Sequence, residues 1–236
     1  MTSGVLPATN VSEMIGAIEA AAHGGAVMYF APEMSIMINR RRDEARLHIC
    51  EEAQTESIEH IAEVASRNNI WVHLGSIPVV HGAGPQLANR SIVISANGEI
   101  IARYDKIHLF DVQVGDAVGG YQESKFFEPG DQVVVAKTPF GHIGLMVCYD
   151  LRFPELALTL RQQGANILSA PAAFTYTTGQ MHWQLLLQAR AMDSQCFVLG
   201  AAQQGWHGEK RQTWGHSGIT NSRGQLLQII DYEGHG

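Results

Sequence analysis

Short apolar runs that alternate with amphipathic helical stretches constrain the fold of this 236-residue chain more than any other feature. Residues 26–31 and 143–147 are apolar segments of strand length, and such runs are typical of strands covered on both faces. Residues 56–67 and 154–163 instead carry apolar side chains at helical spacing. Three pairs of strand-like runs are joined by short turns, one of them Asn97-Gly98, a strong hairpin signal. The pattern predicts an α/β domain with mixed sheets layered with helices.

The rest of the chain follows this pattern with one exception. Residues 106–131 carry four glycines and no periodicity, and a non-periodic stretch of this length inside a compact domain is usually a functional loop. The other expected elements are a helix that Asn10 caps and that ends at Gly24, a helix over 180–194, and strands over 70–77, 166–170 and 196–202.

Composition argues against several classes of protein. Sixteen Lys and Arg against 23 Asp and Glu give a formal net charge of −7, which is unfavourable for a nucleic-acid or anionic-membrane partner. Arg40-Arg41-Arg42 is mixed with acidic residues and predicts a solvated helix face. We find no run of about 18 apolar residues for a membrane span and no secretory signal. The three cysteines form no disulfide framework, so a reducing cytoplasm is the expected location. Metal-binding and nucleotide-binding motifs are absent, so no metal and no cofactor are expected.

Cys148 is the most informative residue for chemistry. It stands where an apolar run meets a polar turn, at the carboxyl end of a predicted strand, and open α/β folds place their ligand sites there. A helix that follows would favour the reactive thiolate form of the side chain. The alternative is a small buried residue without a chemical role. His142 begins the same strand, about 20 Å away at ~3.3 Å per residue, and is too distant to act as its base.

Two charged residues at other strand ends could complement the thiol. Glu33 follows the apolar run 26–31, and a buried carboxylate can act as a general base. Lys106 follows the second strand of the Asn97-Gly98 hairpin, and an ammonium there can stabilise a developing oxyanion. The alternatives are a helix-capping acid for Glu33 and a surface lysine beside Asp105 for Lys106.

Three motifs in fixed order resemble the nitrilase superfamily of carbon–nitrogen hydrolases, over essentially the whole chain. They are Pro32-Glu33, Tyr104-Asp-Lys106-Ile-His-Leu-Phe-Asp111 and Gly144-Leu-Met-Val-Cys148-Tyr-Asp-Leu-Arg-Phe-Pro-Glu155. The resemblance implies a nitrilase-like α-β-β-α sandwich with mixed sheets. It also implies that Cys148 forms a thioester with the substrate acyl group, that Glu33 is the general base, and that Lys106 holds the oxyanion together with a backbone N–H of Cys148 or Tyr149.

The resemblance extends to further residues of the site. The second glutamate of the family corresponds to Glu123, within Gln122-Glu-Ser-Lys125, rather than to Glu128, whose Glu-Pro-Gly-Asp context predicts a turn. Tyr149, Phe174 and Thr175 are the expected substrate-binding residues.

Other stretches resemble the Nit-type branch, and within it the deaminated-glutathione amidases. Among them are Pro171-Ala-Ala-Phe174, His182-Trp183 and Trp214-Gly-His-Ser217. The branch implies hydrolysis of an amide in a small carboxylated substrate with release of ammonia. An ω-amidase or an N-carbamoyl amino-acid hydrolase is the alternative within the family.

Family members carry additional strands at both ends. The resemblance therefore implies one carbon–nitrogen hydrolase domain over residues 1–236 that is incomplete at both ends. A truncated, non-catalytic subunit is the alternative from another functional class. Since family members pair through helices, a homodimer or larger homo-oligomer is expected.

Overall fold

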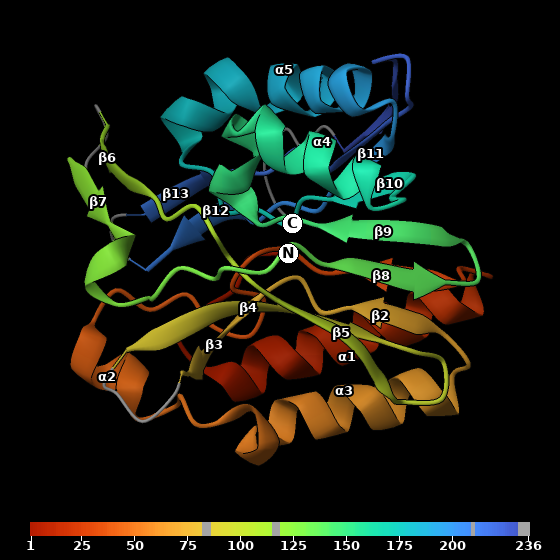
Figure 1. Cartoon of the computed structure of the whole chain (residues 1–236). Helices are drawn as coiled ribbons and strands as arrows, with labels where there is room; N and C mark the ends of the chain where they lie inside the picture. The colour runs from red at the N-terminus through yellow and green to blue at the C-terminus, as the bar shows by residue number, and fades with distance from the viewer. Residues whose placement is uncertain (82–85, 115–118, 209–210, 231–236) are drawn as a thin grey trace.

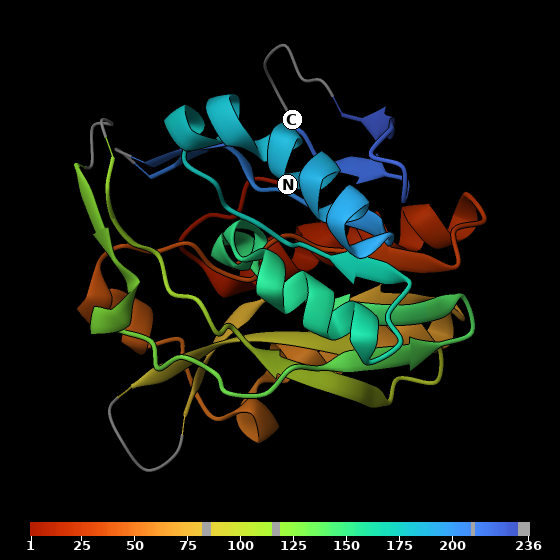
Figure 2. The same ribbon diagram turned by 45° about the horizontal axis from the view of Figure 1, so that its top comes forward.

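The computed structural model describes residues 1–81, 86–114, 119–208 and 211–230, which form four layers (Figure 1). Two sheets face each other at the centre. Helices α1 (Pro7–His23) and α3 (Glu56–Arg67) cover the outer face of one sheet, and α4 (Pro154–Gln162) and α5 (Tyr176–Ser194) cover the outer face of the other. Figure 2 shows the second pair of helices from a different side. The predicted α-β-β-α sandwich with mixed sheets is confirmed.

The first sheet has five strands and is built around its longest member. This strand, β4, pairs antiparallel with β2, β3 and β5, while β1 pairs parallel with β2 at the edge. The bounds are β1 (Met28–Phe30), β2 (Trp71–His73), β3 (Ile77–Val80), β4 (Leu87–Ile94) and β5 (Ile100–Asp105).

The second sheet has six strands in the order β15-β14-β11-β10-β9-β8. Its three central strands are parallel, so their carboxyl ends share one edge of the sheet, and the outer pairings are antiparallel. The bounds are β8 (Val135–Thr138), β9 (Gly141–Leu145), β10 (Ile167–Ser169), β11 (Phe197–Gly200), β14 (Gly218–Thr220) and β15 (Leu226–Ile229).

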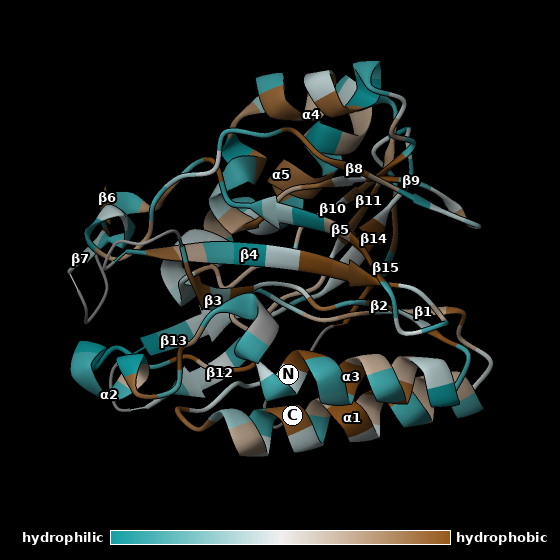
Figure 3. Ribbon diagram, turned by 60° about the horizontal axis from the view of Figure 1, so that its bottom comes forward, coloured by the Kyte–Doolittle hydropathy of each residue, from teal (hydrophilic) through white to brown (hydrophobic). Residues whose placement is uncertain are grey.

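Two apolar cores hold the layers together. One lies between the sheets and beneath α4 and α5 and includes Leu168 and Trp183, and the other joins α1 and α3 to the first sheet through residues such as Ile18 and Ile61. In Figure 3, hydrophilic and hydrophobic residues alternate along α1 and α3, as expected for helices with one face on a sheet. Each large side chain buried in this way contributes about 1.5–3 kcal/mol. No helix within the described ranges is both long and apolar enough to cross a membrane.

Some element boundaries differ from the predictions. Helix α1 begins at Pro7, which suits the first helical turn, so the expected cap at Asn10 is wrong. The Asn10 side chain instead accepts from the Gly4 amide at 2.7 Å and donates to the Ile36 carbonyl at 2.8 Å, and it ties the start of the chain to a distant loop. The strand expected over 70–77 is divided into β2 and the beginning of β3.

Two hairpins were not predicted from the sequence, and of the short helix only a helix face at residues 40–42 was expected. One hairpin, β6 (Asp111–Gln113) with β7 (Gly120–Gln122), lies inside the stretch 106–131 that was expected to be irregular; residues 115–118 of that stretch are outside the described ranges. The other pairs β12 (Gln204–His207) with β13 (Arg211–Trp214), and α2 spans Arg42–Arg46. Elements of three to five residues are too short to show a periodic pattern of apolar side chains from which a helix or strand could be predicted.

The burial of His73, at the end of β2, leads us to predict that the folded protein loses stability in acid. The side chain is fully buried, its Nδ1 accepts from the Gly75 amide at 3.0 Å, and its Nε2 lies 2.9 Å from Ser169 Oγ. Burial lowers the pKa of His73 to about 4, so below the ordinary value of about 6.5 the unfolded chain binds a proton that the folded protein excludes. We expect this residue to lower the free energy of unfolding by roughly 3 kcal/mol between pH 7 and pH 4, measured by urea titration.

A pair of variants isolates this contribution. His73→Gln should reduce the pH dependence, part of which remains because burial also lowers the pKa of His207 to about 4. His60→Gln, on the exposed side of α3, should retain the full dependence. If His73→Gln keeps the wild-type slope, the assignment to His73 is wrong.

Candidate active site

Cys148 lies at a strained turn after β9, where it begins the 3₁₀ helix η3 (Cys148–Arg152). Its φ of 50° is in the left-handed region, which costs a residue with a side chain on the order of 1 kcal/mol or more. The Cys148 amide donates to the Pro171 carbonyl at 2.9 Å and helps to hold this conformation. The turn directs the thiol into a cavity between the two sheets' loops.

Asp150 stabilises this turn through hydrogen bonds of its carboxylate. The sequence analysis did not predict a role for it. Its carboxylate is fully buried and accepts from the Val147 amide at 2.8 Å, from the Tyr104 hydroxyl at 2.7 Å and from the His108 amide at 3.0 Å. Tyr104 and His108 flank Lys106 in the chain. Asp150 therefore fixes the segment that carries Lys106 relative to the turn that carries Cys148.

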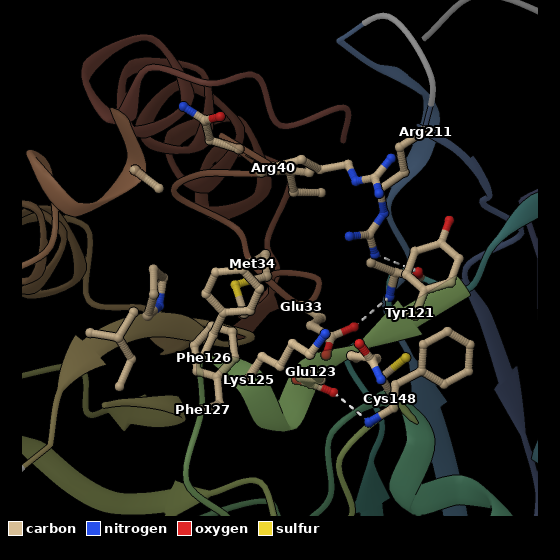
Figure 4. A pocket seen from close by; sticks show the side chains of 18 of the residues that line it. Glu33, Met34, Arg40, Tyr121, Glu123, Lys125, Phe126, Phe127, Cys148 and Arg211 are labelled. Atoms are coloured by element: carbon tan, nitrogen blue, oxygen red, sulfur yellow. Dashed lines mark hydrogen bonds between the residues drawn. The ribbon is translucent and has the colours of Figure 1, made fainter. Parts of the chain in front are cut away.

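Glu33, Lys106 and Glu123 meet beside the thiol although they come from three distant segments (Figure 4). Glu33 follows β1, Lys106 follows β5, and Glu123 begins the 3₁₀ helix η2 (Glu123–Lys125). The Lys106 ammonium donates to Glu33 Oε1 at 2.9 Å and to Glu123 Oε2 at 2.8 Å. The Ala173 amide donates to Glu33 Oε2 at 2.9 Å, which holds the carboxylate from the opposite side.

Asn89, on β4, links the two carboxylates and is a site residue that the sequence reading missed. Its side-chain nitrogen donates to Glu33 Oε1 and to Glu123 Oε1, each at 3.0 Å. Its Oδ1 is buried and has no hydrogen-bond partner among the described residues. No clear signal was available in the sequence, because Asn89 is followed by Arg90 and Ser91 within β4, and three polar residues in a row do not single one of them out.

The charges of this cluster explain why the thiol is neutral at rest. Burial raises the pKa of the Glu33 carboxyl, but the charge and hydrogen bond of Lys106 outweigh burial, and the pKa stays below its usual value. Burial likewise lowers the pKa of Lys106, but the charges of Glu123 and Glu33 hold it well above its usual value. Burial and the charge of Glu33 raise the pKa of the Cys148 thiol well above its usual value. A protonated thiol therefore lies beside a carboxylate that can accept its proton, which agrees with the expected role of Glu33 as base, although the helix that follows was expected to favour the thiolate.

The cavity around these groups has a volume of about 460 Å³ and accommodates a small molecule. Of the three expected substrate-binding residues, Tyr149 and Phe174 line it. Thr175 does not: its hydroxyl accepts from the Thr178 amide at 3.3 Å as the N-cap of α5, and Thr178 contributes to the lining instead. The side-chain oxygen of an N-cap residue accepts a hydrogen bond from a backbone N–H of the first helical turn, so it does not face the cavity.

Basic side chains line the outer part of the cavity, and this was not expected. Residues 40–42 are exposed, as predicted, but only Arg42 is helical, because Arg40 precedes α2. Arg40 and Arg42 also line the cavity. Arg211, at the start of β13, lines it from the other side. Residues 209 and 210, which precede Arg211, lie outside the described ranges. Within those ranges, no group of three or more His, Cys, Asp or Glu is placed to hold a metal ion.

The Asn89 contacts lead to a prediction about pH dependence. Asn89→Leu removes two donors to carboxylates, so we expect the pKa of Glu33 to rise and the acidic limb of the pH profile of kcat/KM to move to higher pH by about one unit. Asn89→Asp should move it further in the same direction because it adds a negative charge. An acidic limb that stays at the wild-type pH in both folded variants would contradict this role.

The four-layer fold with a cysteine at a strained strand-to-turn junction defines a protein of the nitrilase superfamily. The solved structure of the C. elegans NitFhit protein has this fold, with a TM-score of 0.86 and 35% sequence identity, and the match covers 98% of this chain and 56% of that one. The structure of Saccharomyces cerevisiae Nit3, of branch 10 of the superfamily, has a TM-score of 0.85 and 27% sequence identity, and the match covers 97% of this chain and 83% of that one. The model of the carbon–nitrogen hydrolase family matches residues 6–235, and the chain belongs to this family.

The branch resemblance is confirmed by sequence comparison as well. The deaminated glutathione amidase of Yersinia enterocolitica is 47% identical over 170 residues, which cover 72% of this chain and 59% of that protein. The chain therefore spans less than two thirds of this relative's length.

Proposed function

We propose that the protein hydrolyses the amide C–N bond of a small carboxylated substrate through a thioester on Cys148. The observation that supports this most directly is geometric: Cys148, at a strained turn, lines the same cavity as Glu33, and the Lys106 ammonium donates to the Glu33 carboxylate at 2.9 Å. A nucleophile, a base and a fixed positive charge are the groups that acyl transfer requires. Neither a metal ion nor a cofactor is part of the proposal.

The first half of the reaction forms the acyl-enzyme. Glu33 accepts the thiol proton as the sulfur attacks the amide carbon, and the carbonyl oxygen becomes a tetrahedral oxyanion. Lys106 and the Tyr149 amide stabilise this charge; the Cys148 amide is less suitable because it already donates to Pro171. Glu33 then returns the proton to the amide nitrogen, the C–N bond breaks, and ammonia or an amine leaves.

The second half releases the product. Glu33, again a carboxylate, removes a proton from water as the water attacks the thioester carbon. The tetrahedral intermediate collapses, the sulfur leaves with the proton from Glu33, and a carboxylic acid is released. Glu123 and Asn89 make no bond in either half and serve as positioning residues for Lys106 and Glu33.

The test measures both leaving groups and the intermediate. Glutaramate, an unsubstituted amide, would release ammonia, whereas deaminated glutathione, named for the relatives, carries a substituted amide and would release an amine. We expect one of these products from the wild-type protein, and a mass increase equal to the acyl group on Cys148 when its turnover is quenched with acid. Glu33→Gln lacks the base that both halves require and should give neither product nor adduct. Carbon dioxide released with ammonia from an N-carbamoyl amino acid would instead support the carbamoyl alternative. Absence of product and adduct with all three compounds would refute the proposal.

We further propose that residues 1–236 act as one domain, in a homodimer and in the cytoplasm. The exposed side of α5 carries Met181, Leu185 and Met192, which form an apolar face suited to pairing with a second copy of the chain. The proposed location rests on the cysteines: all three are free thiols, which suits a reducing compartment. Sedimentation of the wild type as a dimer and of Leu185→Glu as a monomer would support the pairing. A monomeric wild type would refute it.

A further inference from the structure

Gln203, which follows β11, is a fully buried residue whose side chain binds the backbone of the proposed base. Its Nε2 donates to the Glu33 carbonyl at 3.0 Å and to the Met34 carbonyl at 3.3 Å. Its Oε1 accepts from the Ser3 amide at 3.0 Å. Because an amide oxygen only accepts and an amide nitrogen only donates, these partners allow a single orientation of the side chain.

Three hydrogen bonds close a ring that contains Gln203 and Glu33. The Gln203 backbone amide donates to the Ala172 carbonyl at 2.8 Å, and the amide of the next residue, Ala173, donates to Glu33 Oε2 at 2.9 Å. The Gln203 side chain completes the ring at the Glu33 carbonyl. Glu33 is therefore held at two points, by its carboxylate and by its own backbone.

The ring connects the base to the segment that also holds the nucleophile. Residues 171–173 follow β10, and the Pro171 carbonyl accepts from the Cys148 amide at 2.9 Å. Cys148 follows β9 of the second sheet, whereas Glu33 follows β1 of the first. Residues 171–173 thus contact both reacting residues from the second sheet, and Gln203 binds the backbone of the base to the same sheet.

A further set of buried polar groups holds the Gln203 side chain in place. The Ser3 hydroxyl accepts from Gln203 Nε2 at 2.6 Å and donates to the Ser35 carbonyl at 2.9 Å. The Ser3 carbonyl lies 2.8 Å from His207 Nδ1, whose ring also contacts the Thr213 hydroxyl at 2.7 Å. Ser3, His207 and Thr213 are all buried. Moving the Gln203 amide would leave several of these groups without a partner, and each such loss is costly in the interior.

We propose that Gln203 is a positioning residue for Glu33, and that it fixes the distance between this base and the Cys148 thiol. The proposal rests on the proposed amidase function, in which Glu33 accepts a proton from the thiol and later from water. Proton transfer requires hydrogen-bond contact, and a misplacement of about 1 Å can lower a rate on the order of 100-fold. Gln203 does not line the cavity, so it acts on catalysis through Glu33 and not through substrate binding.

The first experiment compares kcat and KM for glutaramate in two glutamine variants. Gln203→Met keeps nearly the length of the side chain and removes its hydrogen bonds. We expect kcat to fall about tenfold to 100-fold while KM stays within about threefold, because the base moves but the cavity lining is unchanged. The control is Gln188→Met on α5, whose Nε2 also donates to a backbone carbonyl, that of Gly224 at 2.8 Å, and which does not line the cavity. It should keep the wild-type kcat.

Ser3→Ala tests the same assignment with a smaller change. It removes the hydroxyl that binds Gln203 Nε2 and the Ser35 carbonyl, so kcat should fall about threefold to tenfold with KM unchanged. This variant decides the question if Gln203→Met does not fold. A wild-type kcat in Ser3→Ala together with a wild-type kcat or no folded protein in Gln203→Met would overturn the proposal, and so would a fall in kcat that Gln188→Met shares.

Alkylation of the thiol separates this proposal from the proposed function. When iodoacetamide reacts with Cys148, a sulfur–carbon bond forms, iodide leaves and Glu33 accepts the thiol proton, so the rate depends on the base without any amide hydrolysis. Peptide mapping distinguishes Cys148 from the other two cysteines. The rate constant at Cys148 should fall about tenfold in Gln203→Met and stay at the wild-type value in Gln188→Met. If no amide is hydrolysed but alkylation depends on Gln203, the amidase function fails and the positioning role stands. If amides are hydrolysed and neither kcat nor alkylation responds to Gln203→Met, the positioning role fails and the function stands.

Discussion

Cys148→Ser is expected to reduce kcat/KM for amide hydrolysis by on the order of 10⁴-fold or more, because loss of a nucleophile removes the covalent route entirely. A serine hydroxyl keeps nearly the same volume but is far less acidic than a thiol, so a carboxylate with a low pKa cannot deprotonate it. The free energy of unfolding should change by less than about 1.5 kcal/mol, since the substitution conserves shape within the same turn. Steady-state kinetics and urea titration measure the two quantities.

The control for this variant is Cys50→Ser. Cys50 is half-buried and does not line the cavity. Its Sγ lies 3.3 Å from the Gln54 carbonyl, a contact that a serine hydroxyl can also make. It should retain wild-type activity. Hydrolysis by Cys148→Ser at more than a hundredth of the wild-type rate would show that another group attacks the substrate.

Lys106→Leu is expected to abolish turnover and also to destabilise the fold. Its ammonium is 1% exposed, and its removal leaves Glu33 and Glu123 as buried carboxylates without a cation. Breaking a buried ion pair in this way costs about 3–5 kcal/mol, which corresponds to a fall in melting temperature of roughly 10 °C for a chain of this length. Calorimetry on the two proteins measures the difference.

The sign of the pH dependence distinguishes this mechanism from simple loss of packing. In the wild type the pKa of Glu33 is lowered, so its contribution to stability is present above the unfolded pKa of about 4.5 and is lost as the pH falls. In Lys106→Leu burial raises that pKa, so stability should decrease as the pH rises above about 4.5. The destabilisation should therefore be larger at pH 8 than at pH 5.

Two further variants test the same explanation. Lys137→Leu, at an exposed position on β8, is the matched control and should melt close to the wild type. Adding Glu123→Gln to Lys106→Leu should restore part of the lost stability, because it removes one of the two unpaired charges. A double variant no more stable than Lys106→Leu alone would mean that the charges are not the cause.

The sequence alone determined where the strands end and which reactive residues stand there. The runs before Glu33, Lys106 and Cys148 are local patterns, and a strand covered on both faces must end where polar residues begin. The same reasoning predicted α3 and α4 closely, because twelve and nine residues are enough for helical spacing to be visible. Glu33 and Lys106 follow β1 and β5 of the first sheet, whereas Cys148 follows β9 of the second, so the packing of the two sheets against each other brings these residues to one region of the fold.

Only the tertiary structure decided which polar residues complete the site and what charge surrounds it. Asn89 reaches Glu33 across 56 positions of the chain, and Asp150 binds Tyr104 across 46; no local pattern encodes such contacts. Arg40 is exposed, as its own segment predicts, but it also lines the cavity, and its guanidinium carbon lies 5.9 Å from the ring centre of Tyr121 on β7, which is 81 positions away in the chain. Burial, which sets the pKa of Cys148, is likewise a property of the assembled layers, so the resting state of the thiol could not be established from the residues around it.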